Sequence, residues 1–267
     1  MTAAQDPGPE AARGAANRES ADAAARDAAA QEGVRTGNTV PEPSVTSMFD
    51  SIAPVYDRMN TLMTAGMDGR WRRAAVRAAN LSKGGTALDV ACGTGKLTAA
   101  LAAKVGPEGR VEGVDLSPAM LDEAQRAFGA MPGIEFVLGN ALSLPVADRS
   151  FDAATIAFGL RNLASFEDGF REMARAVRSG GRVVCLELSV PRPRFMGRFY
   201  VALFRITAPF IGALFRRRAA YAYLPSSLEG FQPAEEIAAT MRRVGLKDVR
   251  FQRLGLGSVA LHWGTVA

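Results

Sequence analysis

The stretch LDVACGTGKL places an acidic residue and two glycines at the exit of an apolar run. Asp89 lies inside the run, and Gly93 and Gly95 lie in the turn that follows. Glycines let a backbone approach a ligand closely, so this turn predicts a small-molecule site. A second acidic residue, Asp115, ends the next apolar run, where its carboxylate could accept hydrogen bonds from both hydroxyls of a ribose.

Two familiar phosphate-binding turns do not fit this pattern. A P-loop needs a different glycine spacing and a hydroxyl residue directly after its lysine, and neither accompanies Lys96. A dinucleotide fingerprint needs a third glycine where this chain has Thr98. We expect Asp89 to lie near a positive group of the ligand, which favours a nucleoside that carries an amino acid.

From Thr86 onward the sequence alternates between strand and helix patterns, which predicts an α/β fold with a doubly wound parallel sheet. Ser117 and Pro118 are expected to begin the second of the helices that follow Thr86, and the Gly180-Gly181 pair is expected to end the third. Strands are predicted at 86–91, 110–117, 134–140, 151–158 and 182–189, helices at 96–105, 118–128, 164–177 and 234–244, and a late hairpin at 247–254 and 258–266.

Composition divides the 267 residues unevenly. Residues 1–43 contain no Phe, Trp, Tyr, Leu or Ile, so we predict a disordered Ala-rich tail, followed by one domain over 44–267. The tail has no apolar core of a secretory signal, and its acidic residues argue against a transit peptide. The cysteines, Cys92 and Cys185, lack zinc-binding spacing and suit a reducing cytoplasm, so no metal site is expected.

The glycine turn, the two aspartates and the run GNALSLPVADRSFDA together resemble class I S-adenosylmethionine-dependent methyltransferases. In that class the third strand leads to a residue pair beside the adenine, here Asn140-Ala141. The resemblance implies a Rossmann-like, mostly parallel sheet of seven strands, with an antiparallel strand near its end. It also implies S-adenosyl-L-methionine as the cofactor. The residues implied to bind it are Asp89, Gly93, Thr94, Gly95, Asp115, Asn140 and Ala141.

Longer stretches resemble one family of this class, the UbiE/MenG C-methyltransferases of menaquinone and ubiquinone biosynthesis. These stretches are VTSMFDSIAPVYDRMNTLMTAGMDGRW, FGLRNLASFEDGFREMARAVRSGGRVVCLELSVP, YAYLPSSLEGF and SVALHWG. The resemblance implies methylation of a ring carbon of a lipophilic, prenylated quinol, with demethylmenaquinol preferred. The alternatives are 2-polyprenyl-6-methoxy-1,4-benzoquinol, a soluble aromatic metabolite, or no reaction at all, in an inactive cofactor-binding scaffold subunit.

The chain departs from the family pattern at two positions. Asp68 stands where the family usually has a histidine, and Ala157 where it usually has a serine. We expect cofactor binding to survive both changes. The resemblance predicts the substrate less firmly than the cofactor. Because of the two departures, the inactive scaffold subunit remains an alternative.

Methylation of a quinol carbon requires a base or a polarised water to remove the phenolic proton. Arg161 and Asn162 are expected to hold the quinol oxygen or that water, although Arg161 could instead pair with an N-terminal carboxylate. Tyr56 and Asp57 belong to a segment that folds over the cofactor in the family, although Tyr56 could be packing alone. His262, the only histidine, is not expected to be catalytic.

Residues 191–230 are predicted to form a helical insertion that faces the substrate and the membrane. Seven arginines and no acidic residue lie between Glu187 and Glu229, but the apolar pieces are too short to span a bilayer. With a pI near 9.6, this predicts peripheral contact with an anionic membrane, at its cytoplasmic inner face. An arginine-rich helix pair in the core is the alternative. No nucleic-acid motif is present, and a homodimer stays open.

Overall fold

The computed structural model describes residues 37–189, 191 and 231–267. Most of the predicted N-terminal tail and nearly all of the predicted insertion at 191–230 lie outside the described residues. These residues belong to the compact unit that begins at Thr36.

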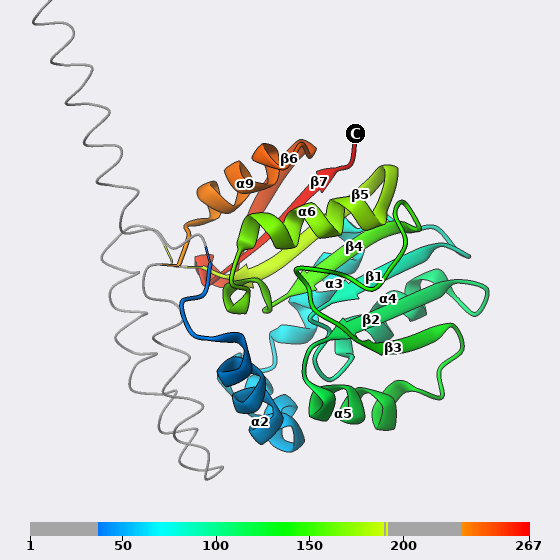
Figure 1. The fold of residues 1–267 in the computed structure, drawn as a ribbon, viewed down its shortest axis with the longest axis vertical. Helices are drawn as coiled ribbons and strands as arrows, with labels where there is room; N and C mark the ends of the chain where they lie inside the picture. The colour runs from blue at the N-terminus through cyan, green and yellow to red at the C-terminus, as the bar shows by residue number, and fades with distance from the viewer. Residues whose placement is uncertain (1–36, 190, 192–230) are drawn as a thin grey trace, which may run out of the picture. The chain divides into compact units, whose positions relative to one another are not determined.

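A seven-stranded sheet organises this unit, in the order β3-β2-β1-β4-β5-β7-β6 (Figure 1). The first five strands pair in parallel, and β7 lies antiparallel to both β5 and β6. The doubly wound, mostly parallel sheet and the late hairpin are therefore confirmed. The strands are β1 (Thr86–Val90), β2 (Arg110–Asp115), β3 (Ile134–Leu138), β4 (Phe151–Ala157), β5 (Val177–Leu188), β6 (Lys247–Leu254) and β7 (Val259–Thr265).

Helices cover both faces of the sheet because neighbouring strand residues point to opposite sides. In β1, Ala87 belongs to the core beneath α3 and α4, whereas Leu88 belongs to the core beneath α6 and α9. The helices are α2 (Glu42–Met63), α3 (Asp68–Ala78), α4 (Lys96–Val105), α5 (Pro118–Phe128), α6 (Phe166–Ala176) and α9 (Ala234–Arg243), with short 3-10 turns η1 (Leu160–Asn162) and η2 (Gly255–Gly257).

The signals for helix ends were right at α5 and wrong at α6. Ser117 begins α5 as predicted, since its hydroxyl accepts a hydrogen bond from the backbone N–H of Met120 at 3.2 Å. The Gly180-Gly181 pair does not end α6. Val177 is already extended (φ −92°, ψ 137°) and pairs with Phe151, so the glycines lie within β5, after its irregular first pairing with β4.

The folded chain also begins earlier than the predicted boundary at residue 43. Asn38 is buried, and its backbone N–H donates to the carbonyl of Leu163 at 2.6 Å. Glu42 is the first residue of α2. Segment composition gave no sign of this docking, because the contacts are made by polar backbone and side-chain groups rather than by large apolar residues.

The close packing of β2 against β3 generates a stability prediction. Gly113 lies opposite Phe136, and a methyl group added there would lie 2.9 Å from the Phe136 ring. We expect Gly113→Ala to lower the free energy of unfolding by about 1–3 kcal/mol, measured by urea denaturation. The control is Gly69→Ala in α3, where the added methyl meets only Arg73 at 3.7 Å. It should be neutral or stabilise by up to about 1 kcal/mol, and equal losses in both variants would contradict the packing argument.

Candidate functional site

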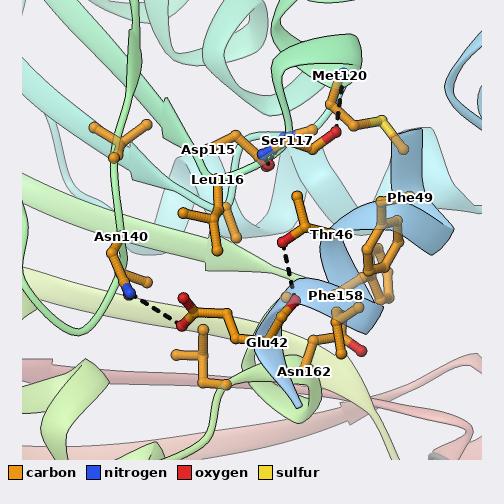
Figure 2. A pocket seen from close by; sticks show the side chains of 18 of the residues that line it. Glu42, Thr46, Phe49, Asp115, Leu116, Ser117, Met120, Asn140, Phe158 and Asn162 are labelled. Atoms are coloured by element: carbon orange, nitrogen blue, oxygen red, sulfur yellow. Dashed lines mark hydrogen bonds between the residues drawn. The ribbon is translucent and has the colours of Figure 1, made fainter. Parts of the chain in front are cut away.

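The first cavity lies at the carboxyl ends of the central strands, where β1 has β2 on one side and β4 on the other. Ligands of open α/β sheets bind at such a change of strand order. The space between its walls, including the part open to solvent, is about 740 Å³. Figure 2 shows the side chains that line it. Each strand from β1 to β4 contributes a residue from its end or the following loop, namely Gly93, Asp115, Asn140 and Phe158.

Two non-glycine residues in the wall of the first cavity have left-handed backbones. Ala91 follows β1 with a φ of 51°, and Phe158 follows β4 with a φ of 60°. This region costs free energy for residues with a side chain, and such strain concentrates at functional sites. Gly93, in the turn after β1, also has a positive φ of 55°. Because it has no side chain, there is open space between its backbone and the Tyr56 ring.

Asp115 presents an oriented carboxylate to the first cavity. One of its oxygens accepts the backbone N–H of Gly93 at 2.7 Å, and the other accepts the backbone N–H of Ser117 at 2.9 Å. Burial raises the pKa of Asp115, while these backbone donors oppose that rise. The backbone N–H of Leu116 also donates to Asp115, so of the about four acceptor positions of a carboxylate there remains capacity for a further hydroxyl donor.

Asp89 lies beneath the glycine turn and is not among the lining residues. Its carboxylate is buried and accepts the hydroxyls of Thr98 at 2.7 Å and Thr155 at 2.8 Å. Burial raises the pKa of Asp89 to about 6. These two bonds connect the Asp89 carboxylate to α4 and β4, and its place beside a positive group of the ligand stays a prediction.

Helix α2 lines the first cavity and lies beside α5, with which it shares a small apolar core. Three of its acidic residues, Glu42, Asp50 and Asp57, are here called the α2 carboxylates. Each is bonded to the loop after a different strand. The donors are Asn140 Nδ2 to Glu42 at 3.0 Å, Ser117 Oγ to Asp50 at 2.5 Å, and Thr94 Oγ1 to Asp57 at 2.7 Å.

A second cavity of about 710 Å³ adjoins the first, since both are lined by Tyr56 and Phe158. Its other walls come from the end of α2, from α3, from the turn after β4, from the last residue of β5 and from Ser258 before β7. Trp71 and Arg161 line this second cavity. Aromatic rings and charged groups therefore face one enclosed space, which suits a flat ring that carries polar substituents.

Arg161 forms a buried ion pair with a residue that the sequence analysis did not identify. Its guanidinium lies 2.6 Å from the carboxylate of Glu187 at the end of β5, and their side chains are 5% and 0% exposed. It also donates to the carbonyl of Phe158 at 2.6 Å. The signal for Glu187 was available, because a lone glutamate in the apolar strand run CLELS must find a partner when buried.

The site residues predicted from the sequence thus do not all line one cavity. Asn162, Ala141 and Tyr56 line the first cavity along with Gly93, Asp115 and Asn140, whereas Arg161 lines the second. Thr94, Gly95 and Asp57 line neither cavity. Thr94 and Asp57 lie at the contact between α2 and the glycine turn, where Asp57 also lies 3.4 Å from Lys96, whereas Gly95 lies against Phe136 and Ala124.

Several lining residues had no signal in the sequence. Thr46 and Phe49 on α2, and Leu116 and Met120 before and within α5, complete the wall of the first cavity (Figure 2). These are ordinary amphipathic-helix residues, and only the docking of α2 onto α5 turns them toward a ligand.

His262 is buried away from both cavities. One ring nitrogen lies 2.9 Å from the carbonyl oxygen of Ala234, and burial lowers the pKa of His262 to about 4, so the ring is neutral at physiological pH. Within residues 37–189, 191 and 231–267, no group of three His, Cys, Asp or Glu side chains is placed to hold a metal ion.

Comparison with known proteins identifies relatives over nearly the whole described unit. The profile of the ubiE/COQ5 methyltransferase family matches residues 37–266. A protein of Bacillus licheniformis named demethylmenaquinone methyltransferase is 39% identical over 84% of this chain and 97% of its own length. A Geobacter sulfurreducens protein named ubiquinone/menaquinone biosynthesis C-methyltransferase UbiE is 39% identical over 82% of this chain and 87% of its own.

Among solved structures, a SAM-dependent methyltransferase from Aquifex aeolicus superposes with a TM-score of 0.55 at 16% identity. The match covers 73% of this chain and 89% of that one. At this identity the similarity concerns the fold, and it agrees with the seven-stranded sheet described above.

The raised pKa of Asp89 predicts an unusual dependence of stability on pH. At about pH 3 and below, its carboxyl is largely protonated in both the folded and the unfolded chain, so it has little effect on the free energy of unfolding. As the pH rises from 3.8 toward about 6, the unfolded chain releases the proton first, and stability falls. The cost of ionising Asp89 in the folded protein then reaches about 3 kcal/mol.

We therefore expect Asp89→Asn to raise the free energy of unfolding near pH 7.5 by about 1–3 kcal/mol and to leave it nearly unchanged at about pH 3. Urea unfolding at both pH values measures this. The matched control is Asp122→Asn on the exposed face of α5, which should show no such difference. If Asp89→Asn changed the free energy of unfolding by the same amount at both pH values, the raised pKa of Asp89 would be contradicted.

Proposed function

This chain belongs to the ubiE/COQ5 methyltransferase family, and on that basis we propose that it transfers a methyl group from S-adenosylmethionine to a ring carbon of a prenylated quinol, with demethylmenaquinol as the preferred acceptor. Family membership makes it an S-adenosylmethionine-dependent C-methyltransferase. The observation that carries the proposal is the pair of adjoining cavities with Tyr56 and Phe158 in the wall they share.

The first cavity fits the adenosyl part of the cofactor. Asp115 retains acceptor capacity for a ribose hydroxyl, and the open space beside Gly93 admits the ligand close to the backbone. Apolar side chains at Leu116, Met120 and Ala141 would contact the adenine. When bound, S-adenosylmethionine supplies an activated methyl group on a positively charged sulfur.

The second cavity would then hold the acceptor ring. Methyl transfer is an in-line displacement, so alignment of the carbon nucleophile with the methyl group provides much of the rate enhancement. Trp71 and Phe158 offer faces against which a flat ring can lie, and Tyr56 lies between the two cavities. We assign these side chains to orienting the ring and to excluding water.

Arg161 and Asn162 are proposed to act on the quinol oxygen. Loss of the phenolic proton makes the ring carbon nucleophilic, and the resulting negative charge needs a fixed positive group. The Arg161 guanidinium is held by Glu187 and by the carbonyl of Phe158, so it requires no reorganisation. Asn162, whose side chain lies at the first cavity, is proposed to hold the same oxygen or a water beside it.

The choice of head group rests on the relatives. The name of the Bacillus licheniformis protein specifies demethylmenaquinone, and that of the Geobacter sulfurreducens protein includes both quinones. The benzoquinol precursor of ubiquinone is therefore the second candidate acceptor.

We also propose peripheral contact with an anionic membrane at its cytoplasmic face. The seven arginines between Glu187 and Glu229, without an acidic residue, support this, and a prenylated substrate resides in lipid. In the described part of the chain no helix combines the length and apolarity needed to cross a bilayer. Flotation with anionic and neutral liposomes tests the contact, and equal recovery with both would contradict it.

The decisive test of the reaction is transfer of a radiolabelled methyl group to short-tailed demethylmenaquinol, to the methoxybenzoquinol and to an unprenylated naphthol, under reducing conditions. We expect the rates to follow that order. If the cofactor binds and no quinol is methylated, the scaffold alternative replaces this proposal.

The same assay tests the role of Arg161. We expect Arg161→Met to lower kcat by about 100-fold, as for loss of a group that stabilises a transition-state charge. Because this variant leaves Glu187 buried without its partner, the double variant Arg161→Met/Glu187→Leu is the control for folding. It should regain stability and remain slow, whereas recovery of kcat would show that Arg161 is only structural. Arg171→Met, at an exposed arginine of α6, should leave kcat unchanged.

The assignment of Asp115 predicts a selective loss of cofactor affinity. Asp115→Asn replaces one acceptor oxygen by a donor, so we expect the Kd for S-adenosylmethionine, measured by calorimetry, to rise about tenfold or more. Asp122→Asn should not change it. An unchanged Kd in Asp115→Asn would remove Asp115 from the cofactor site.

A further inference from the structure

An acidic residue in the wall of the second cavity has no role in the site described so far. Asp68 is the first residue of α3, and its side chain is 9% exposed. One carboxylate oxygen lies 2.5 Å from the guanidinium of Arg72, one turn further along the helix. Both residues line the second cavity.

The aromatic residues of the second cavity hold this ion pair in place. The Arg72 guanidinium lies over the ring of Phe158, 5.6 Å from its centroid, and the Trp71 ring lies 6.3 Å from that of Phe158. Stacking and the ion pair both restrict the arginine, so the carboxylate of Asp68 has a fixed position. Its orientation is therefore set before any ligand enters.

The second oxygen of Asp68 has spare acceptor capacity. The contact made to it is with the hydroxyl of Thr64, at 3.4 Å. That hydroxyl has one proton, and it also lies 2.8 Å from the carbonyl of Asn60, which is the better acceptor by distance. An ionised carboxylate can only accept hydrogen bonds. The second cavity thus offers a fixed acceptor that calls for a donor on the ligand.

From this geometry we propose that Asp68 is a specificity-determining residue that accepts a hydrogen bond from a phenolic hydroxyl of the acceptor ring, so that the second cavity binds the hydroquinone and rejects the oxidised quinone. A hydroquinone carries O–H donors, whereas the oxygens of a quinone only accept. A quinone carbonyl beside Asp68 would leave two acceptors facing each other in a buried site, which is unfavourable.

This inference deepens the proposed function, because it rests on an aromatic acceptor that occupies the second cavity. It differs from a purely structural role for the ion pair, in which Asp68 would only stabilise the start of α3 through its position in the first helical turn. The structural role predicts an effect on stability alone. The role in specificity predicts a change in preference between two ligands that differ only in oxidation state.

Binding can be measured without turnover because Trp71 lines the second cavity. The chain has two tryptophans, so Trp263→Phe leaves Trp71 as the only one. In this background, quenching of Trp71 fluorescence would give the Kd for a short-chain naphthohydroquinone under anaerobic reducing conditions, and for the corresponding naphthoquinone without reductant. We expect the hydroquinone to bind at least about tenfold more tightly.

Asp68→Asn, whose amide can donate to a carbonyl, should abolish or reverse this preference. Arg72→Gln is the matched variant, since it breaks the same ion pair but leaves the carboxylate, and it should keep the preference. If Asp68→Asn does not fold, the double variant Asp68→Asn/Arg72→Gln removes both charges and should lose the preference. A preference unchanged in the variants that lack the carboxylate, or lost equally in Arg72→Gln, would overturn the proposal.

The outcome is separable from that of the proposed function. If the wild type prefers the hydroquinone through Asp68 but methylates no quinol, the methyl-transfer proposal fails and the binding inference holds. If the wild type methylates the quinol while Asp68→Asn retains the preference, the methyl-transfer proposal holds and the role of Asp68 is overturned.

Discussion

The whole site depends on the attachment of α2 across the carboxyl ends of the sheet. A parallel sheet by itself offers only an open crevice, and here the helix closes it by placing one acidic side chain on each of three loops. Apolar side chains buried between α2 and α5, among them Ile52 and Met120, provide much of the stability of this docking. The α2 carboxylates then fix where the helix lies along the strand ends, and thus which of its side chains face the ligand.

The buried charged side chains of this protein are held in fixed orientations by their hydrogen-bond and ion-pair partners. Asp89 is surrounded by hydroxyl donors, Asp115 by backbone N–H groups, and Arg161 by a carboxylate and a carbonyl. Burial of such groups costs stability, and a simple scaffold would gain from replacing them with apolar residues. Their presence is understandable in a site whose polar groups must be oriented before the reactants arrive.

Sequence patterns predicted the sheet well because strand and helix periodicities and cap residues are local. The glycine turn and Asp115 were found at strand ends for the same reason. What failed needed tertiary information: Gly180 lies in a strand because Val177 pairs with Phe151. The second cavity was not foreseen either, because α2, α3 and two loops from distant parts of the chain form it.

The position of β7 has a consequence for synthesis of the protein. This strand comes after all the others in the sequence, yet it lies between β5 and β6. Until β7 is in place, β6 has no neighbour in the sheet and one edge of β5, next to Glu187, stays unpaired. The growing chain can assemble the cofactor end of the sheet early, but the support for Arg161 is completed last. A nascent or truncated chain could thus gain a cofactor pocket before it gains a reaction centre.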